Sequence, residues 1–171
     1  MNGFRYELES RIIGFNGHIF IQKFEDYFDY DFLDIEEIEE IKFVDPNISI
    51  QSLISTNFAT KGILVKSIIP KNISNYSFIN ESDIIDGELN DDEIILGSAL
   101  ADNIGAEVGS LVKLFSSNSY SSPFGQLPKS MNLEVKGLFN SGMNEYDTSF
   151  AFITLSNAQR ILSVENKVSI I

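Results

Sequence analysis

The chain has 171 residues, of which 43% are hydrophobic, and a formal net charge of −13 at pH 7. This composition is typical of a globular protein of one domain or two small ones. It argues against nucleic acid and anionic lipid as partners, because both need a basic surface. The chain has no cysteine and one histidine, His18, so disulfides are excluded and a zinc site would have poor ligands. We expect no nucleic acid partner and no cofactor.

Hydropathy is compatible with two locations of the protein. No apolar run approaches the roughly 18 residues that a membrane-spanning helix needs, and the polar start of the chain does not resemble a signal peptide. Taken alone, these features predict a soluble cytoplasmic protein. A fragment cut from a membrane protein would have the same features.

The first half of the chain is predicted to contain short helices and strands. Apolar side chains that recur every three or four residues predict amphipathic helices over residues 2–13 and 35–41. Apolar and polar side chains alternate or form short apolar runs over residues 18–24, 48–55 and 62–69, which predicts strands.

The second half repeats this mixture. Strands are expected over residues 93–96, 111–115, 131–135, 149–154 and 167–171, and helices over residues 98–103 and 156–162. Ser98 is predicted to cap the first of these helices, and Ser156 with Gln159 to form a capping box for the second. Mixed short elements without a long alternation of strand and helix predict the α+β class.

Catalytic patterns are not evident in the sequence. Ser98 follows Gly97 but has no glycine two residues later, so it is not a nucleophile elbow. With 25 acidic residues, a pair of carboxylates would be available in any fold and carries no information. We therefore do not expect an enzyme. An acidic periplasmic hydrolase is kept as an alternative, which would need close carboxylates with raised pKa values in a cleft.

Residues 116–130 are the most informative segment, because they are predicted to form a long loop between two strands. The first half consists of small polar residues and Tyr120. The second half holds two prolines, with Phe124 and Leu127 on either side of Gly125. An apolar pair on a protruding loop is expected to be buried against something. That something is either the core of the domain or a partner.

Five pieces of the sequence resemble LolC/LolE-type inner-membrane subunits of bacterial lipoprotein-releasing ABC transporters, and they follow one another in the family's order. They are MNGFRYEL at the start, GILVKSI from residue 62, EIILGSALA from residue 93, PFGQLP from residue 123, and SGMNEYD from residue 141 with the stretch that follows to residue 162. No single piece is specific, but the ordered set is.

The resemblance implies a fold and a cellular setting. The fold would be a two-lobed, MacB-like periplasmic core of the α+β class. Residues 1–60 would begin the membrane-proximal lobe, residues 61–155 would form an inserted β-rich lobe with a hook loop at 116–130, and residues 156–171 would return towards the first lobe. The parent would be a multi-pass protein of the inner membrane with this domain in the periplasm.

The resemblance also implies partners. They would be a separate ATPase subunit (LolD), a sister membrane subunit or second copy, a lipoprotein substrate, and the soluble lipoprotein chaperone LolA, which the hook would bind. The expected hook residues are Tyr120, Pro123, Phe124, Gly125, Gln126, Leu127, Pro128 and Lys129.

Relatives also carry a basic patch near the hook. Lys113 matches one of its positions, whereas Ser130 and Met131 depart from the polar and basic residues that relatives carry there. A MacB-type efflux or mechanotransmission transporter, which has the same architecture but a different partner, is the other alternative.

Overall fold

The computed structural model describes residues 17–23, 27–29, 39–41, 43–76, 79, 88–122 and 125–171, with residues 117–122 and 126 described by their backbone path. The helix predicted over residues 2–13 and most of the helix predicted over residues 35–41 lie outside the described residues. Pro123 and Phe124 also lie outside them.

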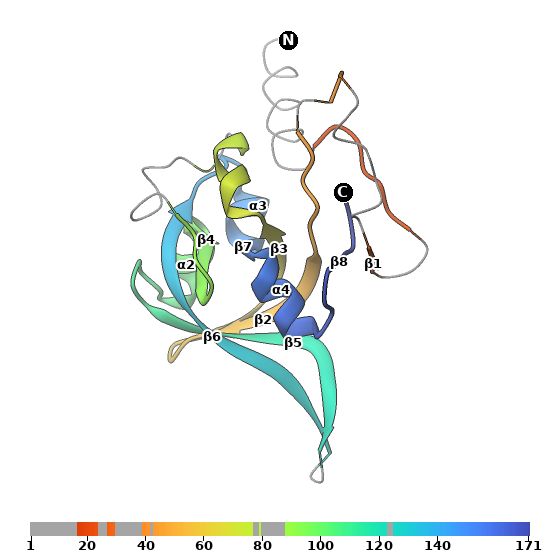
Figure 1. Ribbon diagram of the computed structural model, residues 1–171. Coiled ribbons are helices and arrows are strands. Elements are labelled where there is room, and N and C mark those ends of the chain that lie inside the picture. The colour runs from red at the N-terminus through yellow and green to blue at the C-terminus, as the bar shows by residue number, and fades with distance from the viewer. Residues whose placement is uncertain are drawn as a thin grey trace.

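A closed barrel forms the body of the molecule (Figure 1), with its six strands in the order β2-β3-β7-β4-β6-β5. The strands are β2 Ser49–Ser55, β3 Thr60–Ile68, β4 Glu93–Gly97, β5 Leu111–Ser122, β6 Gly125–Phe139 and β7 Phe150–Thr154. Two of the neighbouring pairs, β3 with β7 and β4 with β6, are parallel, and the other four are antiparallel. The α+β class predicted from the sequence is confirmed.

The barrel is filled because apolar residues alternate along its strands. In β2, Ile50, Ser52 and Ile54 are buried, while Gln51 and Leu53 between them are exposed. Leu133 and Val135 of β6 are both fully buried, as the predicted alternation in this strand requires. The interior residues of all six strands belong to one core cluster.

Among the residues that the structure describes, three α-helices and one 3₁₀ helix connect the strands: α2 Ser98–Ile104, α3 Asn144–Ser149, α4 Leu155–Leu162 and η2 Pro70–Asn75. The apolar faces of α2 and α4 pack into the barrel core. Gly105 ends α2 in the left-handed conformation, with φ 64°.

Both predicted helix caps are wrong by one or two residues. Gly97, not Ser98, is the N-cap of α2. At α4 the hydroxyl of Thr154, two residues before Ser156, accepts from the backbone N–H of Asn157.

The two chain-end segments meet beside the barrel (Figure 1). β1 Phe28–Asp29 pairs antiparallel with β8 Lys167–Val168. Ile21 and Ile171 exchange two backbone hydrogen bonds, with N···O distances of 2.8 and 3.1 Å. The strand predicted over residues 18–24 is therefore wrong in its described part, which has this one pairing and no regular strand. The strand predicted over residues 167–171 is present in its first two residues.

The barrel includes β2, which pairs with both β3 and β5. The boundary predicted after residue 60 therefore falls within the barrel and not between two packed bodies. α4, expected to return towards the first lobe, contributes Ala158, Ile161 and Leu162 to the barrel core.

Candidate partner-binding site

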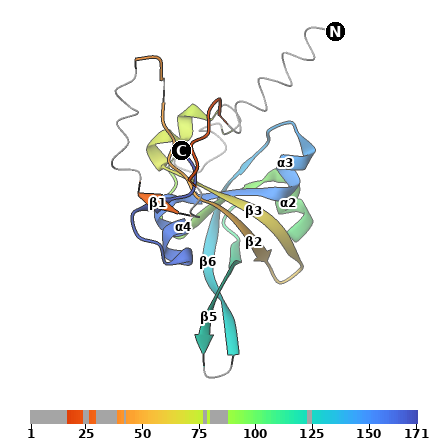
Figure 2. The same ribbon diagram turned by 90° about the vertical axis from the view of Figure 1, so that its right-hand side faces the viewer.

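β5 and β6 extend beyond the barrel as a two-stranded ribbon (Figure 2). Their outermost pairs are Ser119 with Pro128, Tyr120 with Leu127, Ser121 with Gln126 and Ser122 with Gly125. We call residues 116–122 of β5 and 125–130 of β6 the distal hairpin. The loop predicted over residues 116–130 is thus wrong for most of its length, because its two halves pair with each other as strands.

The hairpin separates from the barrel where its strands lose their other neighbours. The pairing of β2 with β5 ends at Ser116, and the pairing of β4 with β6 begins only at Glu134. The register between β5 and β6 shifts between Phe115 and Ser119. Irregularities of this kind bend and twist a strand, so the ribbon can leave the curvature of the barrel at this point.

The structure places most of the predicted hook residues on this hairpin. Gly125, Gln126, Leu127, Pro128 and Lys129 follow one another in β6, and Tyr120 lies opposite Leu127. The side chain of Leu127 is 42% exposed and Pro128 is exposed as well. The sequence left two possibilities for Leu127, burial in the domain's own core or burial against a partner. Burial in the core is not observed. The placement of Pro123 and Phe124 lies outside the described residues.

Lys129 marks the base of the distal hairpin. Its ammonium donates to the hydroxyl of Ser163, the residue that ends α4. This contact joins the hairpin to the end of a helix whose other face packs in the barrel core.

Lys113 lies on the outer face of β5, two pairs from the pair of Phe115 with Ser130 at the base of the hairpin. Its Nζ is 5.2 Å from the centroid of the Phe115 ring, a cation–π contact that holds the ammonium at the surface. Ser130 is exposed and pairs with Phe115, whereas Met131 packs against the barrel core. Lys113 and Ser130 are therefore available to a partner at the hairpin base.

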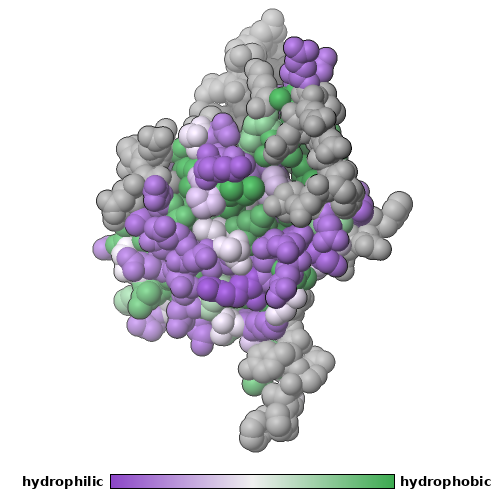
Figure 3. Space-filling model, viewed as in Figure 1, coloured by the Kyte–Doolittle hydropathy of each residue, from purple (hydrophilic) through white to green (hydrophobic). Residues whose placement is uncertain are grey.

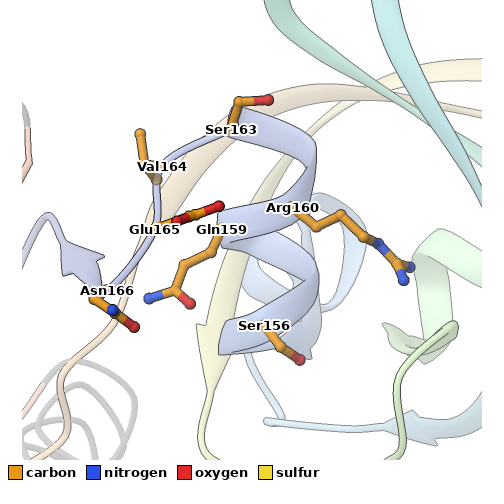
Figure 4. Close-up of a pocket in the computed structure, with 7 residues that line it drawn as sticks. All are labelled: Ser156, Gln159, Arg160, Ser163, Val164, Glu165 and Asn166. Carbon is orange, nitrogen blue, oxygen red and sulfur yellow. The ribbon is translucent and has the colours of Figure 1, made fainter.

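A second surface feature, which the sequence did not reveal, is an open depression along α4 (Figure 4). Its volume is about 710 Å³, and it is lined by Ser156, Gln159, Arg160, Ser163, Val164, Glu165 and Asn166. Two of its lining residues, Arg160 and Ser156, are already engaged by neighbouring side chains. Arg160 pairs with Asp92, and the hydroxyls of Ser156 and Thr154 donate to Asp91, which lowers the pKa of that carboxyl.

The hydrolase alternative can be compared with the titratable groups of the structure. Burial raises the pKa of Asp45 and lowers that of Lys66. The hydroxyl of Tyr76 and the amide of Asn72 donate to the Asp45 carboxylate. Among the described residues, this part-buried cluster contains one carboxylate, not a close pair. Within the described ranges, no three His, Asp or Glu side chains come together in a way that could hold a metal.

Comparison with known proteins adds sequence relatives. No family model matches the chain. It is 27% identical over 180 residues to the lipoprotein-releasing system transmembrane protein LolC of Neisseria meningitidis serogroup B, a match that covers 99% of the chain and 42% of that protein. It is 34% identical over 79 residues to the protein of the same name from Xylella fastidiosa strain Temecula1, covering 46% of the chain and 18% of that protein. The chain spans about two fifths, 42%, of the length of the Neisseria relative.

A solved structure shares the fold. The extracellular domain of the noncanonic ABC-type transporter YknZ from Gram-positive bacteria superposes with a TM-score of 0.55 at 12% identity, over 88% of the chain and 79% of that domain. The resemblance to LolC-type subunits inferred from the sequence is therefore confirmed, and the fold is that of a transporter's extracellular domain. No helix in the part of the chain described above combines the length and apolar character needed to cross a membrane.

Proposed function

We propose that this chain is the periplasmic domain of a LolC-type membrane subunit of a lipoprotein-releasing ABC transporter, and that its distal hairpin binds the soluble chaperone LolA. The observation that carries the proposal is the projecting ribbon with Leu127 exposed. It is formed by the segment in which the sequence resembles the hook of the family. The role is binding and force transmission, with ATP hydrolysis in the separate subunit LolD.

The physical basis for binding is an exposed apolar side chain on a preorganised support. Two paired strands fix the backbone before a partner arrives, so less conformational entropy is lost on association. A large apolar side chain gains about 1.5–3 kcal/mol when it is fully buried. Leu127, which is already ordered and exposed, can supply this gain without unfolding any part of the barrel. Phe124, which lies between β5 and β6 in the sequence, would add to it.

The sequence relatives support the setting in a membrane protein. The chain is similar over 99% of its length to a LolC transmembrane protein, of which it spans 42%. In that parent, a sister subunit or second copy and the lipoprotein substrate would complete the transporter of the inner membrane.

The test is a binding measurement between the purified domain and LolA, by calorimetry or surface plasmon resonance. Replacing Phe124 and Leu127 together with Ser should weaken binding at least tenfold, about 1.4 kcal/mol, without lowering the melting temperature. The matched control is Leu64→Ser, because Leu64 is 38% exposed on the barrel and Leu127 is 42% exposed on the hairpin. Equal affinity of the double variant and the wild type would refute the hairpin as the binding site.

The same measurement separates the proposal from its alternatives. A wild-type domain without measurable affinity for LolA would favour a MacB-type transporter, whose partner differs. A folded domain that hydrolyses glycosides or peptides, with activity lost in Asp45→Asn, would favour the hydrolase.

A further inference from the structure

We infer that the outer edge of β5 in the distal hairpin binds an extended strand of the partner through backbone hydrogen bonds. This inference rests on the proposed function and specifies how the hairpin holds its partner. The occupant is a segment of the chaperone in β conformation, lying antiparallel to β5 over residues 117–122.

The first argument is that each strand of the hairpin has an edge beyond its barrel neighbour. Within the described ranges, β2 pairs with β5 only as far as Ser116, and β4 pairs with β6 only from Glu134 onwards. The backbone groups on these edges face away from the hairpin's own ladder. A row of such groups is a template for another strand.

The second argument is that the two edges are not equivalent. The edge of β6 contains Pro128, which has no N–H to donate, and Lys129, whose ammonium is held at Ser163. Proline and lysine are the residues that commonly block pairing at sheet edges. Residues 117–122 of β5 contain neither proline nor charge. The asymmetry therefore directs an added strand to β5.

The third argument identifies the backbone groups of β5 that point towards an added strand. Opposite residues in an antiparallel ladder alternate between pairs that exchange hydrogen bonds and pairs that do not. Ser119 lies opposite Pro128, which cannot donate, so this is a non-bonded pair. By alternation, Tyr120 with Leu127 is a bonded pair and Ser121 with Gln126 is not. The N–H and C=O groups of Ser119 and Ser121 therefore point to the outer edge of β5.

The position of the added strand follows from the same pairings. It would occupy, beyond Ser116, the side of β5 that β2 occupies inside the barrel. An added strand that bonds both Ser119 and Ser121 would extend the β2 side of the sheet out of the barrel. Because backbone groups make these bonds, the recognition tolerates changes in the side chains of both partners.

Hydrogen exchange on the intact domain gives the direct test. In the free protein the amides of Tyr120 and Leu127 should already be protected, because they bond across the hairpin, and those of Ser119 and Ser121 should exchange rapidly. Saturation with purified LolA should slow exchange at Ser119 and Ser121 at least tenfold. Unchanged exchange at both amides in the saturated complex would overturn the inference.

A substitution at one outward amide gives the second test. Ser121→Pro removes the donor at a position where an edge strand tolerates proline, and it should weaken LolA binding at least tenfold. Ser121→Thr keeps the N–H and should bind within twofold of the wild type. If Ser121→Pro disturbs the hairpin, seen as loss of the cross-strand Hα–Hα contact between Ser119 and Pro128, an amide-to-ester replacement of the same N–H takes its place.

Failure of this inference is distinguishable from failure of the proposed function. If the Phe124 and Leu127 double variant loses affinity while the Ser121 backbone variants do not, the hairpin binds the chaperone by its apolar tip and the edge inference is wrong. If none of these variants changes affinity, the hairpin is not the binding site and both are wrong.

Discussion

The barrel and the distal hairpin share two strands but differ in how their residues are held. In the barrel, β5 and β6 each have a neighbour on both sides, and inward residues such as Leu114 and Leu133 have no exposed surface. Beyond Ser116 the same strands pair with each other alone within the described ranges, and Leu127 is 42% exposed. In the view of Figure 3, hydrophilic residues predominate over the lower part of the body and hydrophobic residues gather above them. β5 and β6 therefore form part of the closed barrel along one stretch and an exposed ribbon along the other.

Because of this difference, we expect the barrel to determine the stability of the fold and the hairpin to determine partner binding. An isolated two-stranded hairpin is marginally stable in water, so the distal hairpin depends on the register set in the barrel by pairs such as Leu114 with Met131. The barrel does not depend on the hairpin in return, because its core residues lie elsewhere. Changes in the barrel should therefore alter folding, and changes in the hairpin should alter binding.

The largest effect is expected at Gly97, where β4 meets α2. A Cβ at this position would lie 2.3 Å from the backbone oxygen of Asp147 in α3, so main-chain atoms would have to move. Gly97→Ala should lower the free energy of unfolding by about 3 kcal/mol, the upper part of the usual range for overpacking. Urea unfolding followed by circular dichroism measures it.

Gly62→Ala is the matched control for that substitution. A Cβ at Gly62 in β3 would meet only the end of the Leu53 side chain at 4.0 Å. Its effect should stay within about 0.5 kcal/mol, as for most surface substitutions. Equal losses in the two variants would show that glycine flexibility, not the contact with α3, sets the cost at Gly97.

The sequence predicted the individual strands of the barrel better than the pairings between strands that close it. Alternation identified β6 from Met131, Leu133 and Val135, because one face of that strand is buried and the other is solvated. The pairings of β2 with β5 and of β3 with β7 join segments far apart in the chain. Register of that kind depends on packing between elements, which no local pattern records.

The candidate site was located correctly by the sequence but given the wrong conformation. Serine, asparagine, proline and glycine are typical of loops, so residues 116–130 were predicted as a loop. They form a ribbon instead, because an edge strand tolerates proline and polar residues that a central strand does not. The depression along α4 could not be predicted. Its ion pair joins Arg160 to Asp92, which is 68 residues away in the chain.

A smaller effect is expected at Tyr76, which packs with Phe152 on the outside of the barrel. Its hydroxyl donates to the part-buried carboxylate of Asp45. Tyr76→Phe leaves that acceptor with fewer donors, which should cost about 1–3 kcal/mol. Chemical denaturation at neutral pH measures the loss, and Phe is the matched change because it keeps the ring.

The cost of Tyr76→Phe should also depend on pH. Burial raises the pKa of Asp45, so the stability that this group contributes is present below its ordinary pKa of 3.8 and is lost as pH rises through the folded-state pKa. The Tyr76 hydroxyl lowers that pKa, and its removal raises it further. The difference from the wild type should therefore be larger at about pH 7 than at about pH 4. The same difference at both values would mean that Asp45 does not ionise against this hydroxyl.

The smallest effect on stability is expected from removing the hairpin altogether, and this variant tests the comparison most severely. Residues 117–128 would be replaced by Asn-Gly, which joins Ser116 to Lys129 through a tight turn suited to two antiparallel strands. The barrel pairs and the contact of Lys129 with Ser163 are retained. The free energy of unfolding should change by less than about 1 kcal/mol, while affinity for LolA falls below detection.

The control is the same Asn-Gly replacement of the β2–β3 turn, residues 56–59. There Thr56 donates its hydroxyl to the carbonyl of Ile104 at 2.6 Å, so the turn is tied to the end of α2 and its loss should cost more stability while sparing binding. A shortened hairpin that unfolds the domain would show that the ribbon stabilises the barrel. One that still binds LolA would place the contact surface on the barrel face around Lys113.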